Sequence, residues 1–467
     1  MDEVLANAHP CEPVGAKQGL LGQPPLDHPR LQRLTQARTP RCIAAHPTSA
    51  AGSRAPRGSW RPGLRGGALI LLAVAIAVAS IASGCGRLEP PASGQEAALS
   101  PLPQRMLWVD ALENAARLVK PGRLSHVLDV AKSDGFDTIV LGVKDASGLV
   151  VYPSRIAPHF SEWSKATRGT THFREFPPGY DLVAAAIREA HARGMKVYAG
   201  FPVFMEGTRL NHIRLGRAFQ HPDWQQMSCV GGRVVPVSRF RQFVSVSPCN
   251  PQVVRYELSV LRELVATYPL DGLILDYCRY AGPSTDVSPF CRARFEAYLG
   301  HKVTNWPADL SRRPQLRAKW LQWRCSSIKA FVRDAVREVR GVRPSTRVGA
   351  YFGGWYDRHL SVGTNWASRT YRGPGADPST ALADMLDLLV LGFYTPDLKA
   401  AATGVLQARR VVADAKPIYG GVYARQFAGN PEGLARAAEL MARATSGLMV
   451  FDLSWVEKLG LWEAVGK

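Results

Sequence analysis

The chain has 467 residues, of which 46% are hydrophobic and 21% charged, and its formal net charge at pH 7 is +20. This composition is typical of a globular protein and excludes a wholly disordered chain. A basic chain attracts polyanions, but it has no basic run with interleaved aromatic residues and no zinc-finger or helix-turn-helix spacing, so nucleic acid is not an expected partner. Acidic glycans and anionic lipid headgroups fit the charge better.

The first 85 residues contain a segment typical of export. Residues 66–84 are apolar, follow four arginines and lead into Ala82-Ser83-Gly84-Cys85. A positive region, an apolar stretch and small residues before a cut describe a secretory signal, and a Cys directly after them resembles a bacterial lipobox. Several acyl chains on one residue are enough for stable membrane attachment. We predict a lipoprotein signal over residues 56–85 with lipidation at Cys85; the alternative is an uncleaved transmembrane helix.

The segments on either side of this signal have no regular pattern. Residues 1–55 are rich in Ala, Pro and Arg, which indicates disorder or an over-long gene model. Residues 86–103 contain four prolines and are predicted to be a flexible tether. Gly86 follows the lipidated Cys, which favours an outer membrane if the cell has one. We therefore expect a domain tethered at an outer membrane or at the outer face of the cytoplasmic membrane.

From residue 104 onward, apolar β-rich runs alternate with helical patterns. Predicted helices include 122–133, 180–193, 251–268, 288–299, 315–340, 379–385, 399–413 and 431–444. The predicted strands are Met106–Asp110, Thr138–Asp145, Lys196–Phe204, Asp271–Asp276, Arg347–Phe352, Leu386–Tyr394, Pro417–Tyr423 and Gly447–Asp452.

Eight strands, each followed by helix-forming sequence, predict an α/β fold, a (β/α)8 TIM barrel that forms a single domain over residues 104–467. Runs such as Leu273-Ile274-Leu275 are apolar throughout, as in strands buried on both faces. Insertions are expected after strand two, over residues 146–179, and after strand three. A doubly wound open sheet is the runner-up, but it predicts a glycine-rich phosphate loop that the chain does not contain.

Five cysteines follow Cys85. Cys229 and Cys249 flank a predicted strand-turn-strand excursion around Gly231-Gly232, and an oxidising compartment permits disulfides. We therefore predict a bridge between Cys229 and Cys249. No CxxC, HExxH or paired-histidine spacing occurs, so neither a metal site nor a cofactor is expected.

Polar and aromatic side chains follow the predicted strands, at the edge where function resides in such barrels. Aromatic faces stack on sugar rings, carboxylates bind hydroxyls, and glycosidic cleavage needs two carboxyl groups in different protonation states. The alternative is structural, because an Asp after a strand often caps the next helix. Asp276 stands out, because it ends a fully apolar strand. The residues are Asp110, Lys144, Asp145, Glu206, Asp276, Arg279, Tyr280, Tyr351, Trp355, Tyr394, Tyr423, Asp452 and Trp455.

Three segments resemble one known family. Asp271-Gly-Leu-Ile-Leu-Asp276-Tyr-Cys-Arg279-Tyr280 is similar to the DGI-x-x-D-x-x-RY fourth-strand signature of the glycoside-hydrolase-like barrels, bacterial domains related to the alpha-amylase superfamily. Val143-Lys144-Asp145-Ala-Ser-Gly148 resembles their second-strand segment, and His191-Ala-Arg-Gly194-Met-Lys196-Val-Tyr198 resembles their third-strand entry. The resemblance covers residues 107–456.

The resemblance implies a glycosidase-type site with Asp276 as the fourth-strand nucleophile or base. Amylase-type enzymes carry an acid/base Glu after strand five, where this chain has Tyr351-Phe352-Gly353-Gly354. Asp145 is therefore our first candidate for the acid and Glu206 the second.

We expect an exported hydrolase of a cell-surface or extracellular polysaccharide, with acidic polysaccharides among the candidates. The alternative is a glycan-binding lipoprotein that has the barrel without the chemistry. In either case the expected substrate-binding residues are Lys144, Arg279, Tyr280, Tyr351, Trp355, Tyr394, Tyr423, Asp452 and Trp455.

Overall fold

The computed structural model describes residues 99–466. The predicted signal, Cys85 and most of the tether lie outside this range. Within residues 99–466, no helix has the length and apolarity needed to cross a membrane.

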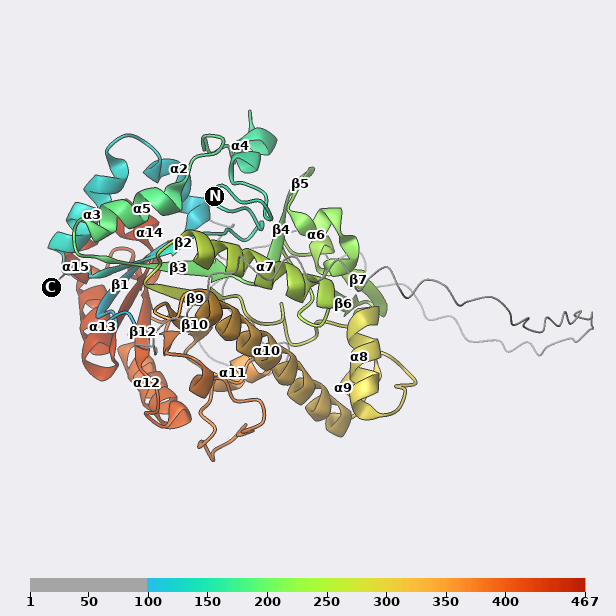
Figure 1. Cartoon of the computed structure of the whole chain (residues 1–467). Coiled ribbons are helices and arrows are strands. Elements are labelled where there is room, and N and C mark those ends of the chain that lie inside the picture. Colours follow the sequence, from blue (N-terminus) through green and yellow to red (C-terminus); the bar gives the residue numbers. More distant parts are fainter. Residues whose placement is uncertain (1–98, 467) are drawn as a thin grey trace, which may run out of the picture. The chain divides into compact units, whose positions relative to one another are not determined.

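Eight parallel strands form a closed barrel (Figure 1), in the order β1-β13-β12-β11-β10-β9-β3-β2. Closure confirms the predicted TIM barrel and excludes the doubly wound open sheet. The strands are β1 (Arg105–Val109), β2 (Thr138–Gly142), β3 (Lys196–Pro202), β9 (Gly272–Asp276), β10 (Arg347–Gly353), β11 (Leu388–Gly392), β12 (Ile418–Tyr423) and β13 (Gly447–Phe451).

The barrel interior is filled by large side chains that point inward from alternate positions. Trp108, Tyr198 and Tyr419 belong to this inner cluster, and each is less than 5% exposed. Glycine on a neighbouring strand makes room for them: a Cβ on Gly272 would lie 2.3 Å from the Tyr198 ring. The other face of each strand packs against helices, which explains why the strand sequences are apolar throughout.

Helices surround the barrel, and several of them begin with a residue whose side chain caps the first turn. Asp110, Asp181 and Asn250 each accept a hydrogen bond from a backbone N–H in the first helical turn. The helices are α2 (Ala111–Leu118), α3 (Arg123–Ser133), α5 (Leu182–His191), α7 (Pro251–Thr267), α8 (Pro289–Leu299), α9 (Asp309–Arg312), α10 (Pro314–Val342), α11 (Tyr356–Leu360), α12 (Leu398–Val412), α13 (Pro431–Ala444), α14 (Leu453–Lys458) and α15 (Trp462–Val465).

The structure differs from the predicted elements in several short helices that were not predicted, among them α4 (Ser161–Thr167), α9, α11, α14 and α15, and in two further places. Helix α2 starts directly after β1, where no helix was predicted. The helix predicted over 379–385 is only a single turn, Ala383–Met385. The chain before that turn is a loop fixed by buried Asn365, whose Nδ2 donates to the carbonyl of Asp377 and to Thr380 Oγ1. These bonds hold the backbone in a non-helical path.

Two insertions extend from the barrel, and Figure 1 labels α4 in the first and β4 to β7 in the second. The first follows β2 and contains α4 (Ser161–Thr167). The second follows β3 and contains a three-stranded antiparallel sheet and a separate hairpin. Its elements are β4 (Met205–Leu210), β5 (Ile213–Leu215), α6 (Arg217–Gln220), β6 (Met227–Val230), β7 (Arg233–Pro236) and β8 (Phe243–Ser245).

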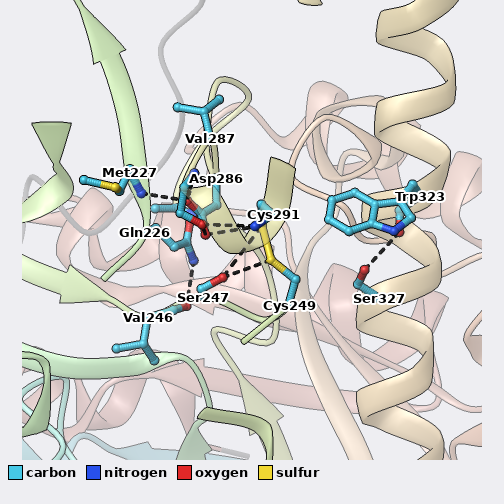
Figure 2. The surroundings of a disulfide bond; sticks show 12 residues. Gln226, Met227, Val246, Ser247, Cys249, Asp286, Val287, Cys291, Trp323 and Ser327 are labelled. Atoms are coloured by element: carbon cyan, nitrogen blue, oxygen red, sulfur yellow. Dashed lines mark hydrogen bonds between the residues drawn. A yellow bond between two sulfur atoms is a disulfide. The ribbon is translucent and has the colours of Figure 1, made fainter. Parts of the chain in front are cut away.

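The predicted Cys229–Cys249 bridge is wrong. Cys249 forms a disulfide with Cys291, and Cys229 is an exposed free thiol (Figure 2). The hairpin around Gly231-Gly232 exists, but it directs Cys229 on β6 to solvent. Cys249 lies just before α7, beside the first turn of α8, so the bridge fastens the end of the second insertion to the helix that follows β9.

Candidate active site at the mouth of the barrel

A pocket of about 720 Å³, including space open to solvent, lies at the carboxyl ends of the strands. It combines carboxylates with aromatic rings, and one wall, Phe243, comes from the second insertion. Its lining is Trp108, Asp110, Leu112, Gly142, Lys144, Ala146, Gly200, Pro202, Phe243, Asp276, Tyr277, Tyr351, Tyr394 and Phe451.

Asp276, the last residue of β9, is 8% exposed and lines this pocket. Its Oδ1 accepts a hydrogen bond of 2.6 Å from the N–H of Tyr277, whose φ of +47° is uncommon for a residue other than glycine. Burial raises the pKa of Asp276 to about 6, against the opposing effects of Arg279 and the Tyr277 N–H. The Asp276 carboxyl is therefore mostly ionised at neutral pH. A positive φ such as that of Tyr277 is a form of backbone strain that concentrates at functional sites.

Asp110 places a second carboxyl in the same pocket, from the end of β1. It caps α2 by accepting the N–H of Glu113 at 3.3 Å. Desolvation, followed by the charges of Asp452 and Glu113, raises the pKa of Asp110 well above its usual value. Burial and the neighbouring carboxylates thus all favour the protonated form of Asp110, whereas Arg279 favours the ionised form of Asp276.

Asp452 follows β13, the strand that pairs with β1, and its charge is one of the causes that raise the pKa of Asp110. Its Oδ2 accepts from Asn114 Nδ2 at 3.0 Å and its Oδ1 accepts from Ser454 Oγ at 2.7 Å. Burial raises the pKa of Asp452 to about 6, while these hydrogen bonds favour its ionised form. The charge of Asp452 then disfavours ionisation of Asp110, so that neighbouring carboxyls differ in protonation state.

The aromatic wall includes Trp108 within β1, Tyr351 within β10 and Tyr394 just after β11. Tyr351 packs edge-on against Trp108 at 5.8 Å between ring centroids, and Tyr394 lies 6.1 Å from Tyr351. Burial raises the pKa of both tyrosines, so their hydroxyls stay protonated. Tyr423 does not line the pocket but packs behind Tyr394 at 5.4 Å. The wall offers apolar ring faces and protonated hydroxyls, as sugar binding requires.

Asp145 is held inside the loop that follows β2. Its Oδ1 accepts the N–H groups of Ser147 and Leu149, each at 2.9 Å. Burial, opposed by these hydrogen bonds, raises the pKa of Asp145 to about 7. The neighbouring Ala146 lines the pocket, whereas Asp145 does not. The carboxyl thus shapes the loop that forms one wall.

Glu206 belongs to a buried group of three charges. Lys144 Nζ donates to Glu206 Oε1 at 2.6 Å and to Glu257 Oε2 at 2.8 Å, and all three side chains are 0% exposed. Burial opposes the charge on Lys144, but the two glutamates outweigh it and raise its pKa. Breaking such a buried pair would strand a charge. The group therefore joins the β2 loop, β4 and α7, and both carboxylates engage the Lys144 ammonium where its side chain lines the pocket.

The remaining predicted binding residues have packing contacts. Arg279 lies over the Tyr277 ring at 4.6 Å, beside the pocket, whereas Tyr280 is fully buried under Arg324 at 4.2 Å. Trp355 packs near Phe393, and Trp455 lies between Arg425 and Lys458. Of the residues predicted at the strand ends, the structure brings five into the pocket, namely Asp110, Lys144, Asp276, Tyr351 and Tyr394.

We predict that Asp276→Asn stabilises the protein at pH 7 to 8 by about 1–3 kcal/mol, since a rise of two pKa units costs about 1.4 kcal/mol per unit. The folded-state pKa lies above the unfolded value, so the folded protein binds the extra proton between about pH 4 and pH 6. The penalty for ionisation grows as pH rises through that window. Denaturant unfolding of the wild type and of Asp276→Asn at several pH values measures the difference in their free energies of unfolding. Asp223→Asn, at an exposed position, is the control; a gain for Asp276→Asn that does not shrink by pH 4 would contradict this account.

A family model described as glycosyl hydrolase-like 10 matches residues 103–423. The chain is 25% identical to an S-layer-related protein of Niallia circulans over 77% of this chain, but it spans only 24% of that protein. It is 24% identical to glycosyl hydrolase DigH of Escherichia coli K12, over 67% of this chain and 70% of DigH.

Solved structures with the same fold include the PgaB (BpsB) glycoside hydrolase domain of Bordetella bronchiseptica, with a TM-score of 0.54 and 16% identity over 78% of this chain and 98% of that one. The alpha-L-fucosidase isoenzyme 2 of Paenibacillus thiaminolyticus has a TM-score of 0.52 and 15% identity over 78% of this chain and 48% of that one. The family model covers more than half of the sequence and ends with β12, the strand before the last one in the barrel. The chain belongs to the glycosyl hydrolase-like 10 family.

Proposed function

We propose that the chain is a glycoside hydrolase of a cell-surface or extracellular polysaccharide, exported and held at a membrane by a lipid anchor. The observation that carries the hydrolase proposal is the pair Asp276 and Asp110, two carboxyls in one aromatic-lined pocket whose charged neighbours act in opposite directions. Arg279 lowers the pKa of Asp276, whereas Asp452 and Glu113 raise that of Asp110. Pairs of carboxyls with separated pKa values are the requirement of glycosidic cleavage. The names of DigH and PgaB (BpsB) as glycoside hydrolases point the same way.

In the proposed reaction, Asp110 donates its proton to the glycosidic oxygen as the bond from the anomeric carbon to that oxygen breaks. Ionised Asp276 stabilises the positive charge on the anomeric carbon, either by attacking it or by taking a proton from the attacking water. Water supplies the hydroxyl of the new reducing end. Asp110 replaces Asp145 and Glu206 as our choice of acid, because Asp145 is hydrogen-bonded within its loop and Glu206 is paired with Lys144.

We predict that Asp276→Asn and Asp110→Asn each slow hydrolysis by roughly 10²–10⁴-fold, whereas Asp145→Asn stays close to wild type because an amide oxygen can still accept in that loop. The full-length protein is incubated with a panel of bacterial and plant polysaccharides, and new reducing ends are measured. Loss in Asp145→Asn with full activity in Asp110→Asn would return the role of acid to Asp145.

The same assay tests the second candidate, a protein that binds glycan without cleaving it. The absence of a Glu after β10, where the chain reads Tyr351-Phe352-Gly353, favours this candidate. Retention of one polysaccharide by the wild type, with no release of reducing ends from any of them, would establish a binding module.

The pH dependence follows from the two carboxyls. Activity should rise as pH increases through about 6, where Asp276 loses its proton, and fall again where Asp110 ionises. Asp452→Asn removes the neighbouring negative charge that holds the pKa of Asp110 high. The descending limb of the rate profile should therefore move to lower pH in that variant, with the ascending limb unchanged. A descending limb that stays in place would remove Asp110 from the acid role.

Support for the anchor comes from residues 56–85. We predict that the mature protein begins at an acylated Cys85, and that Cys85→Ser abolishes acylation and cleavage. Mass spectrometry of the N-terminal peptide from the membrane fraction measures both. A mature protein that still contains residues 66–84 without acylation would favour the uncleaved transmembrane helix.

A further inference from the structure

A second pocket, of about 310 Å³ including space open to solvent, shares Leu112 with the active-site pocket. It lies between the two insertions, since its walls include Trp163 and Arg174 from the first and Gln242 from the second. Gln242 and Phe243 are consecutive, and each lines one of the two pockets. The two pockets are therefore adjoining parts of one cleft above the barrel, with a wall in common.

The second pocket has an apolar surface and fixed polar groups. Trp163 is 3% exposed, and its Nε1 donates to the carbonyl of His172 at 2.9 Å, which fixes the ring. Arg174 Nη1 donates to the carbonyl of Phe173 at 2.9 Å, so the guanidinium is tied to its own loop at the pocket wall. An aromatic residue beside a positioned guanidinium suits a sugar ring with an acidic substituent.

Gln242 supplies an independent sign that a ligand belongs here. Its Nε2 is a buried donor that meets no acceptor among the described residues. Leaving such a donor unsatisfied costs about 1–3 kcal/mol, and a carboxylate or hydroxyl oxygen in the pocket would satisfy it. This donor, together with Arg174 and His172, makes the pocket rich in groups that bind oxygen acceptors.

Charge divides the cleft into two ends. The active-site end holds ionised Asp276, which would repel a carboxylate. The second pocket has Arg174 in its wall, and the insertion that supplies Gln242, residues 203–250, has six arginines and two acidic residues, although none of those arginines lines the pocket. The acidic side chain in the second pocket is Glu113, which follows Asp110 by three residues and marks the border between the two ends.

We propose that the second pocket is a subsite for a sugar that carries a carboxylate, adjoining the sugar whose glycosidic bond is cleaved. The proposal rests on the function proposed for the active-site pocket, and it names the substrate as an acidic polysaccharide. Arg174 binds the carboxylate, Gln242 donates to an oxygen of the same ring, and Trp163 with Leu112 contacts its apolar surface. Glu113 limits affinity for the anion.

The test measures binding without turnover, in the full-length Asp276→Asn protein, by calorimetry. The probes are three acidic oligosaccharides, from polygalacturonate, alginate and hyaluronan, each beside its neutral methyl ester. At least one acid form should bind more tightly than its ester. Arg174→Gln should weaken that acid by roughly tenfold, the value of one charge-assisted hydrogen bond, and Glu113→Gln should strengthen it. Neither change should affect the ester.

Arg188→Gln, at an exposed position on α5 that pairs with Glu189, is the matched control and should leave all affinities unchanged. Thermal melting establishes that each variant is folded. No preference for any acid form over its ester, or equal losses for Arg174→Gln and Arg188→Gln, would overturn the proposal. Because the assay needs no catalysis, selective binding of an acid by a wild-type protein that cleaves nothing would uphold the subsite and reject the hydrolase.

Discussion

Closure of the barrel between its first and last strands is the constraint on which the site depends. The pairing of β1 with β13 sets Met106 against Met449 and Leu107 against Val450. It thereby brings the residues after those strands, Asp110 and Asp452, to the same part of the mouth, although 342 positions separate them in the chain. An open sheet would leave the two carboxyls at opposite edges. The pairing of β1 with β13 thus places Asp452 where its charge raises the pKa of Asp110.

A second constraint is the buried charge group of Lys144, Glu206 and Glu257. Buried ion pairs add little net stability compared with apolar packing, but they define which elements lie together. Here the three side chains come from the β2 loop, β4 and α7, and they fix the base of the second insertion against the barrel. The insertion can then present Phe243 to one pocket and Gln242 to the other.

Much of the barrel could be predicted from the sequence, because a strand that is buried on both faces has a continuous apolar sequence, and such a run is recognisable without knowledge of the fold. Asp276 was recognisable for the same reason, since it ends such a run. Asp110 was harder to interpret, because an Asp after a strand can be a helix cap, and in this structure it both caps α2 and lines the pocket. Local patterns carry no information about which distant groups meet. The Lys144–Glu206 contact, the Cys249–Cys291 bridge and the second pocket all depend on such meetings.

The Cys249–Cys291 bridge links the end of the second insertion to α8, and so to the chain that leaves β9 after Asp276. Thiols remain reduced in most cytosols, whereas disulfides form and persist in oxidising compartments. If the chain is exported, the bridge between the second insertion and α8 would form only after translocation. A precursor still in a reducing cytosol would then hold these two parts of the cleft together by packing alone.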